Sequence, residues 1–320
     1  MSNPDILMLR PMMPHVLEQL TEPFNLHRHW EHPQPDKYLK EVAPRIRGLA
    51  AGSGHQRIDG SIMDRLPNLE IVSSFGVGYD HVDASHAGSK GVIVTNTPDV
   101  LNEEVEDTTL GLLLNTLRQL PQAERYLRAG KWLEKPYPLT STLRDRKIGI
   151  LGYGRIGKAI ARRLDAFGVE VVYHGRSRQE GAPHAFYPTL VEMARYVDVL
   201  VVIIPGGPET NNLVDAEVLE ALGPNGVLIN VARGTVVDEK ALIKALQDKT
   251  ILSAGLDVFA DEPRVPQELI DMDHVVLLPH VGSASVYTRD AMGQLVVDNL
   301  SSWFAGKGPL TPVTETPYKA

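Results

Sequence analysis

Cysteine is absent from the 320 residues of this chain. Disulfide frameworks, thiolate nucleophiles and cysteine-ligated zinc or iron–sulfur sites are therefore excluded. Any redox chemistry must come from a bound cofactor, and no metal site is predicted.

Positive charge is scarce relative to negative charge. Against 40 aspartates and glutamates stand 32 lysines and arginines, which gives a formal net charge of -8. A chain with this balance has no general attraction to nucleic acid or to anionic lipid, so we expect neither as a partner. An anionic small molecule would need a local site made of one or two arginines and backbone amides.

Long apolar runs are also missing. None approaches the length of a membrane-spanning helix, and the first ten residues lack the apolar core of a secretion signal, so we expect a cytoplasmic protein. What is present is a 43% hydrophobic content spread over a long chain. Size scaling favours dividing such a chain into two domains.

Short aliphatic runs alternate with helix-periodic segments, which is typical of an α/β fold with parallel sheets covered on both faces. Predicted strands in the first third occupy residues 5–9, 46–50, 70–74 and 92–95. Six further strands, a number that suits a dinucleotide-binding sheet, are predicted at residues 147–151, 169–173, 199–204, 227–230, 252–257 and 275–278. Amphipathic helices are predicted at 102–120 and 238–249. A last amphipathic helix is predicted at 288–304, and no predicted strand follows it.

A glycine-rich turn follows the predicted strand at 147–151. Gly152, Gly154 and Gly157 form G-x-G-x-x-G, and a helix pattern covers 155–167. Gly152 permits the tight turn, Gly154 permits close approach of a pyrophosphate, and Gly157 permits close contact between helix and strand. A purely structural turn is the alternative, but the strand before it and the helix after it favour dinucleotide binding.

The next strand indicates which nicotinamide cofactor is used. NAD sites usually end this strand with a carboxylate for the ribose 2′-hydroxyl, and no acid occurs in 171–178. Arg176, Ser177 and Arg178 stand there instead, and arginines pair well with a 2′-phosphate. We therefore predict NADP(H), the alternative being that both arginines are solvated loop charges.

Polar side chains follow three later strands. Arg233, Asp257 and His280 come at or just after predicted strand ends, and Glu262 lies five residues beyond Asp257. Ligands of open α/β sheets bind at the carboxyl ends of the strands, so these groups could meet over a nicotinamide. Singly, each is weak evidence, and their joint occurrence after a dinucleotide turn makes them catalytic candidates.

Five motifs occur in order along the chain: 75-FGVGYDHVD-83, 152-GYGRIG-157, 230-NVARG-234, 255-GLDVF-259 and 279-PHVGS-283. On these motifs the chain resembles the D-isomer-specific 2-hydroxyacid dehydrogenase family, and most closely its NADPH-dependent glyoxylate/hydroxypyruvate and hydroxyphenylpyruvate reductases. The resemblance covers nearly the whole length. It implies two doubly wound parallel-sheet domains, a Rossmann cofactor domain at 99–285 inserted in a flavodoxin-like substrate domain at 1–98 plus 286–320.

The resemblance also implies an activity, NADPH-dependent reduction of small 2-keto acids to D-2-hydroxy acids. In it, Arg233 binds the substrate carboxylate and keto oxygen, His280 is the acid/base, and Glu262 pairs with His280. The amides of Val77 and Gly78 would bind the substrate carboxylate. The implied cofactor contacts are Arg155, Ile156, Arg176, Ser177, Pro205, Val231 and Asp257.

Family members are typically homodimers, and segment 132–138 lies where the resemblance puts the interface. Trp132 or Tyr137 would either pack there or reach the neighbour's pocket. One alternative function is a nucleotide-sensing protein like the co-repressors of the same fold. Another is a dehydrogenase for a different acid such as formate or phosphite, or for a bulkier 2-keto acid such as hydroxyphenylpyruvate, with loops 10–13 and 51–56 expected to decide among them.

Overall fold

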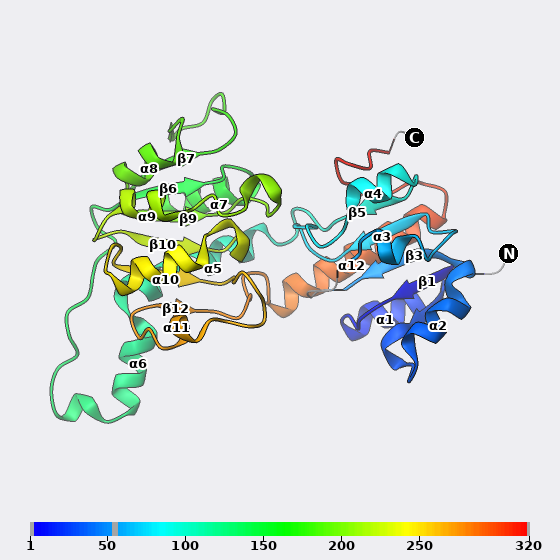
Figure 1. The fold of residues 1–320 in the computed structure, drawn as a ribbon, viewed down its shortest axis with the longest axis horizontal. Coiled ribbons are helices and arrows are strands. Elements are labelled where there is room, and N and C mark those ends of the chain that lie inside the picture. The colour runs from blue at the N-terminus through cyan, green and yellow to red at the C-terminus, as the bar shows by residue number, and fades with distance from the viewer. Residues whose placement is uncertain (1–2, 53–56, 319–320) are drawn as a thin grey trace. The chain divides into compact units, whose positions relative to one another are not determined.

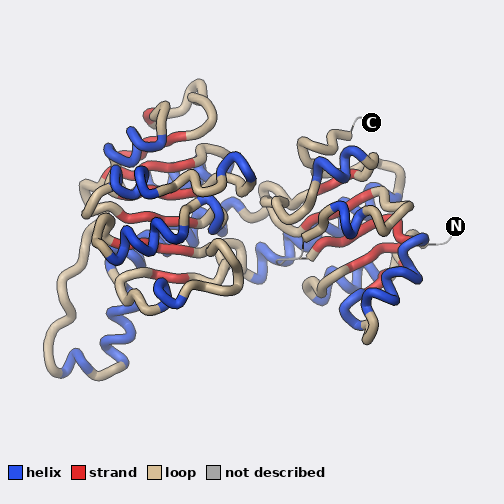
Figure 2. Tube along the Cα trace, viewed as in Figure 1, coloured by secondary structure: helices blue, strands red, loops and turns tan. Residues whose placement is uncertain are grey.

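The computed structural model describes residues 3–52 and 57–318, so residues 53–56 of the predicted specificity loop lie outside the described residues. The chain divides into two units. One comprises Met1–Leu101 and Ser285–Ala320, and the other comprises Asn102–Ala284. Each unit contains its own sheet, drawn as red strands in Figure 2, with helices around it (Figures 1 and 2).

The first unit has a five-stranded sheet in the order β2-β1-β3-β4-β5, with every pairing parallel. This is the flavodoxin-like order. Its strands are β1 Asp5–Met8, β2 Asn25–Arg28, β3 Ile46–Ala51, β4 Ile71–Ser74 and β5 Ile93–Thr95. Its α-helices are α1 Pro14–Thr21, α2 Pro35–Val42, α3 Gly60–Met63, α4 Ala84–Ser89 and α12 Val286–Phe304, with 3₁₀ turns at His29–Glu31 and Ala43–Arg45.

The last helix and the C-terminal segment both belong to this unit. α12 packs against β4 and α1 and buries Val296 and Leu300 completely. The segment that follows runs beside the edge strand β5, where the Val313 amide donates to the Val94 carbonyl over 2.9 Å. α12 and the C-terminal segment, although far from the first strands in sequence, are therefore part of the same α/β unit.

The second unit has a seven-stranded parallel sheet in the order β12-β11-β10-β9-β6-β7-β8, a Rossmann order with one added strand. Its strands are β6 Lys147–Leu151, β7 Glu170–His174, β8 Ala185–Phe186, β9 Val199–Val202, β10 Val227–Asn230, β11 Ser253–Leu256 and β12 Val276–Leu277. Its α-helices are α5 Asn102–Arg118, α6 Leu120–Arg128, α7 Arg155–Asp165, α8 Leu190–Tyr196, α9 Ala216–Leu222, α10 Glu239–Gln247 and α11 Gln267–Ile270, with 3₁₀ turns at Lys131–Leu133, Pro208–Thr210 and Gly234–Val236.

Two hydrophobic cores lie in the second unit, one on each face of its sheet. Side chains of α5 and α7, such as Leu112 and Ile160, pack with Ile148 and Ile150. Side chains of α8, α9 and α10 form the other core. Because aliphatic side chains cover both faces of the sheet, the strands read as unbroken apolar runs, as predicted.

The predicted fold class is confirmed, with three corrections in detail. β2 was not predicted because its sequence, NLHR, has no aliphatic run. His27 in this strand is buried, and its ring nitrogens form hydrogen bonds of 2.6 Å to Tyr38 and to Asp5. The two-residue β8 was also missed. The single helix predicted at 102–120 is two helices, because Gln119 adopts a left-handed conformation with φ 49° between α5 and α6.

Within the described part of the chain, no helix is both long and apolar enough to span a bilayer. A cytoplasmic location stays a prediction. For the site, the important feature is that all strands of a parallel sheet end at the same edge, so the segments after β6, β7, β9, β10, β11 and β12 are brought together there.

Candidate active site

The predicted phosphate-binding turn connects β6 to α7. Gly152 has φ +104°, and a Cβ atom there would lie 2.3 Å from the Ile203 carbonyl oxygen. A Cβ atom on Gly157 would lie 2.0 Å from the Gly152 carbonyl oxygen. Gly154 precedes α7, whose first turn contains Arg155 and Ile156. Only glycine fits positions 152 and 157, and the N-terminus of α7 offers backbone amides to an anion, so the turn fits a dinucleotide pyrophosphate.

Arg176, Ser177 and Arg178 lie just after β7, and all three side chains are exposed. Neither arginine forms an ion pair with any residue that the structure describes. Two exposed guanidinium groups at this edge of a negatively charged chain can attract a multiply charged anion. The residues present therefore fit a 2′-phosphate.

The other predicted cofactor contacts follow neighbouring strands. Pro205 lies after β9, Val231 directly after β10, and Asp257 directly after β11. Pro205 is exposed, whereas Val231 and Asp257 are buried. These positions share the sheet edge that carries the glycine-rich turn.

Glu262 and His280 are in direct contact. The His280 Nδ1 atom lies 2.7 Å from Glu262 Oε2, and the Phe259 amide donates to Glu262 Oε1 over 3.0 Å. The Glu262 side chain is 12% exposed and the His280 side chain 45%, so the carboxylate is sheltered while the imidazole reaches solvent. A carboxylate acceptor assigns the proton of the neutral ring to Nδ1 and leaves Nε2 to carry a transferred proton.

Asp257 holds the backbone that carries His280. Its two carboxylate oxygens accept hydrogen bonds from the Val281 and Gly282 amides over 2.7 and 2.8 Å, and its carbonyl accepts one from the His280 amide over 2.9 Å. Burial raises the pKa of Asp257 above its ordinary value, although the two amide hydrogen bonds act in the opposite direction. His280 itself has φ +53°, a conformation that a non-glycine residue keeps only where its surroundings impose it.

Arg233 lies in the turn after β10, the strand next to β11. The Arg233 carbonyl accepts a hydrogen bond from the Asn230 side chain over 3.0 Å, and its Nη1 atom donates to the Ala232 carbonyl over 2.7 Å. The next residue, Gly234, is so close to Phe259 that a Cβ atom would lie 1.8 Å from the Phe259 carbonyl carbon. The turn carrying Arg233 is therefore packed against the segment whose amide binds Glu262.

Val77 and Gly78 lie in the first unit, in the turn after β4. The turn is held by Thr97, whose hydroxyl accepts from the Gly76 amide over 3.0 Å, and by Asn96, which donates to the Val77 carbonyl over 2.9 Å. Among the described residues, the Val77 and Gly78 amides have no hydrogen-bond acceptor. Two such amides in a fixed turn can bind a carboxylate.

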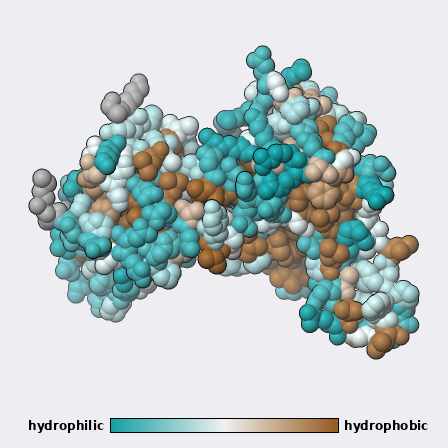
Figure 3. All heavy atoms as spheres, turned by 180° about the vertical axis from the view of Figure 1, so that it is seen from behind, coloured by the Kyte–Doolittle hydropathy of each residue, from teal (hydrophilic) through white to brown (hydrophobic). Residues whose placement is uncertain are grey.

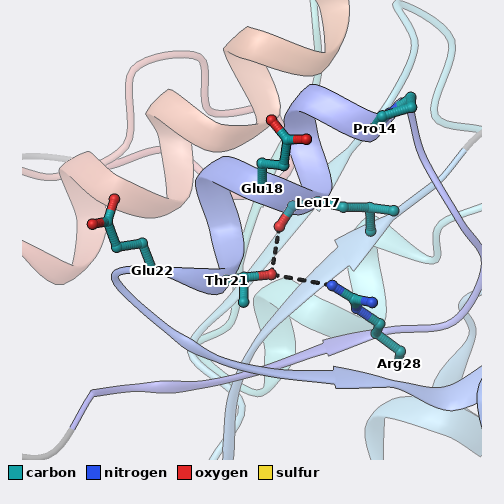
Figure 4. Close-up of a pocket in the computed structure, with 6 residues that line it drawn as sticks. All are labelled: Pro14, Leu17, Glu18, Thr21, Glu22 and Arg28. Atoms are coloured by element: carbon teal, nitrogen blue, oxygen red, sulfur yellow. Dashed lines mark hydrogen bonds between the residues drawn. The ribbon is translucent and has the colours of Figure 1, made fainter.

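A surface hollow of about 670 Å³ also lies on the first unit, beside α1 and β2 (Figure 4). Thr21 and Arg28 are hydrogen-bonded to each other inside it over 3.3 Å. The two glutamates in its lining disfavour an anionic ligand, so it does not fit a keto acid. The lining residues are Pro14, Leu17, Glu18, Thr21, Glu22 and Arg28.

Sequence reasoning missed the supporting residues of the site. Asp257 was predicted as a catalytic candidate and as a cofactor contact, but not as the residue that holds the backbone of His280, and Asn96 and Thr97 were not predicted at all. The motifs 255–259 and 279–283 could have indicated a contact, since both follow adjacent strands. No cluster of side chains suited to a metal ion occurs in the described ranges.

The chain is similar to known proteins over most of its length. Residues 110–282 match the model of the D-isomer specific 2-hydroxyacid dehydrogenase NAD-binding domain. A glyoxylate/hydroxypyruvate reductase A of Arabidopsis thaliana is 46% identical, over 96% of this chain and 98% of that protein. A hydroxyphenylpyruvate reductase of Plectranthus scutellarioides is 44% identical over the same shares. The crystal structure of a Sinorhizobium meliloti NADPH-dependent glyoxylate/hydroxypyruvate reductase with NADP and malonate is 52% identical, with a TM-score of 0.93 over 100% of this chain and 99% of that one.

Proposed function

The chain belongs to the D-isomer-specific 2-hydroxyacid dehydrogenase family, and from this we propose that it reduces small 2-keto acids such as glyoxylate and hydroxypyruvate with NADPH. The observation that carries the proposal is the contact between His280 and Glu262 at the sheet edge that also bears the glycine-rich turn. An acid/base pair beside a dinucleotide site suits carbonyl reduction.

The chemistry assigns a role to each catalytic candidate. When bound, NADPH supplies the hydride that reduces the keto carbon. The keto oxygen gains negative charge, and His280 donates a proton to it from Nε2. Glu262 pairs with Nδ1 of the imidazole and keeps the ring oriented, while the Arg233 guanidinium polarises the keto group and binds the carboxylate.

Substrate binding uses charge and backbone amides together. The carboxylate of a 2-keto acid requires donors, and the Val77 and Gly78 amides offer two in a turn that Asn96 and Thr97 hold. Fixed donors of this kind need no reorganisation when the anion binds. We assign these amides and Arg233 to the substrate carboxylate.

One panel of substrates distinguishes the proposed function from two alternatives, an enzyme for a bulkier keto acid and a nucleotide-sensing protein. NADPH oxidation is measured with glyoxylate, hydroxypyruvate, pyruvate and hydroxyphenylpyruvate, and then repeated with NADH. We expect the highest kcat/KM with glyoxylate or hydroxypyruvate and NADPH. A preference for hydroxyphenylpyruvate would identify the bulkier-substrate enzyme, and absence of turnover with every acid despite NADPH binding would favour a nucleotide-sensing protein.

The proposed preference for NADPH over NADH depends on Arg176 and Arg178. Replacing both with alanine removes charge-assisted bonds to the 2′-phosphate, so KM for NADPH should rise by roughly ten- to a hundredfold while KM for NADH changes little. Steady-state kinetics with both cofactors measures this. Arg195→Ala, an exposed arginine on α8, serves as the control. Equal changes for both cofactors would contradict the assignment.

We also propose that the protein is a homodimer that associates through an arm of the second unit. The arm comprises α6 and residues 129–140, and it extends away from the sheet of that unit (Figure 1). Figure 3 shows hydrophobic atoms on it at the lower right. Leu127, Trp132, Leu133 and Leu139 are 53%, 65%, 95% and 103% exposed. Several large exposed apolar side chains on one segment favour a protein interface.

A further inference from the structure

Segment 175–184, here called the arginine loop, connects β7 to β8 and carries Arg176, Ser177 and Arg178. Its three cofactor candidates are exposed. Hydrogen bonds nevertheless fix the loop at two residues that follow these in sequence, Gln179 and His184; each set of bonds is called a tie below. Both ties lead to the glycine-rich turn or to the helix that follows it.

The first tie is made by Gln179. Its side-chain Nε2 atom donates to the Tyr153 carbonyl over 2.6 Å, and its backbone amide donates to the Tyr173 hydroxyl over 2.8 Å. Tyr153 stands between Gly152 and Gly154, inside the glycine-rich turn. Gln179 therefore joins the arginine loop directly to the backbone of that turn.

The second tie is made by His184. Its Nδ1 atom lies 2.6 Å from the Tyr153 hydroxyl, and its Nε2 atom lies 3.0 Å from Asp165 Oδ1 at the end of α7. The His184 side chain is only 10% exposed. The Tyr153 ring stacks on the Tyr173 ring, with centroids 4.1 Å apart and planes at 20°. The loop is thus bonded to both the carbonyl and the hydroxyl of one tyrosine.

We propose that Gln179 and His184, acting through Tyr153, are positioning residues that hold the arginine loop in the conformation that receives the 2′-phosphate of NADP(H); this rests on the proposed function. Arg176–Arg178 lie between two fixed points, the paired end of β7 and Gln179. A loop that is ordered before the ligand arrives loses less conformational entropy on binding than a loop that must first be ordered. Only ligands that contact the loop benefit from this.

A positioning role and a general structural role predict different effects on ligand binding. Ligands without a 2′-phosphate use the glycine-rich turn but have no group for the arginine loop. Loosening the loop should therefore weaken binding of 2′-phosphorylated ligands selectively. Loss of the turn itself would weaken all adenosine phosphates alike.

The experiment uses the full chain and two probes, adenosine 2′,5′-bisphosphate and adenosine 5′-monophosphate. Dissociation constants are measured by calorimetry for wild type, Gln179→Met, Tyr153→Phe and the double variant. These substitutions keep side-chain size and remove the hydrogen-bonding groups. For the double variant we expect roughly tenfold weaker binding of the bisphosphate and less than a twofold change for the monophosphate. Tyr187→Phe, which contributes to neither tie, is the matched control.

The outcomes separate this inference from the function on which it rests. Equal weakening of both probes, or no weakening of either, overturns the positioning role alone. If wild type binds both probes equally, the 2′-phosphate assignment fails and the inference fails with it. Should the double variant unfold by circular dichroism, Gln179→Met decides alone, since its side chain lies in a loop outside the cores.

Discussion

His280 and Glu262 are 18 positions apart, and their side chains meet because they follow adjacent strands of one sheet. The contact also depends on Asp257, which binds the two amides after His280 and keeps the positive φ of that residue. A proton donor must be held within hydrogen-bond reach of the group it serves. At this site the buried Asp257 carboxylate positions the backbone, and the partly buried Glu262 carboxylate positions the ring.

Replacing His280 with asparagine should lower kcat for keto-acid reduction by about 10²–10⁴-fold, because the proton donor is lost. The NADPH dissociation constant should stay within about twofold, since His280 makes no part of the phosphate sites. Stopped-flow turnover and fluorescence titration of NADPH measure the two quantities. His86→Asn is a matched control, because His86 also pairs with a carboxylate, Asp64 at 2.9 Å. Near-normal kcat in His280→Asn would remove His280 as the donor.

Motifs indicated the principal candidates at this scale, and the supporting contacts needed coordinates. Gly152, Arg233 and His280 are recognisable in the sequence because their residue types follow predicted strands. The tie from Gln179 to Tyr153 has no such signature. A single hydrogen bond between two loops depends on their three-dimensional paths, which residue types alone do not specify.

At the scale of elements, α5 and α7 are joined by an unusual buried acid. Glu106 on α5 is fully buried; its Oε1 atom contacts Arg163 and lies 3.4 Å from Arg162, both on α7, and its Oε2 atom has no hydrogen-bond partner within the described chain. Burial raises the pKa of Glu106 above its ordinary value, although the two arginines oppose the shift. The folded protein therefore holds this proton at pH values where the unfolded chain has released it.

This pKa shift predicts a specific pH dependence of stability. As pH rises from the ordinary glutamate range through the raised pKa, the free energy of unfolding should lose the contribution of protonated Glu106, about 1.4 kcal/mol per pKa unit. Glu106→Gln cannot titrate, so wild-type stability minus variant stability should fall as pH rises. Urea unfolding of both proteins between pH 4.5 and 8 measures the difference. A difference that is constant over this range would contradict the raised pKa.

At the scale of the whole molecule, two units with separate sheets divide the predicted roles. The glycine-rich turn, the arginine loop and the four catalytic candidates belong to Asn102–Ala284, and the amides proposed for the substrate carboxylate belong to the other unit. A net charge of -8 would repel an anionic substrate in general. Binding must therefore depend on local donors such as Arg233 and the turn amides.

The arm predicts the oligomeric state. Leu133→Ser combined with Leu139→Ser replaces two almost fully exposed leucines and should convert a dimer into a monomer, because apolar burial drives association. Size-exclusion chromatography with light scattering measures the mass. Leu310→Ser, which changes a 53% exposed leucine in the first unit, is the control and should leave the mass unchanged. A wild-type monomer would contradict the arm's role.

The sequence by itself determined the α/β class and most strands of both sheets, and it indicated the glycine-rich turn and the candidate catalytic residues. These features are local or periodic, because strands buried on both faces and glycine turns leave a pattern in consecutive residues. Only the tertiary structure decided that β2 and β8 extend the sheets, that Gln119 breaks the long helix, and that Asp257 holds His280. The two added strands and the Asp257 hydrogen bonds depend on contacts between separate segments of the chain, and such contacts override local preference.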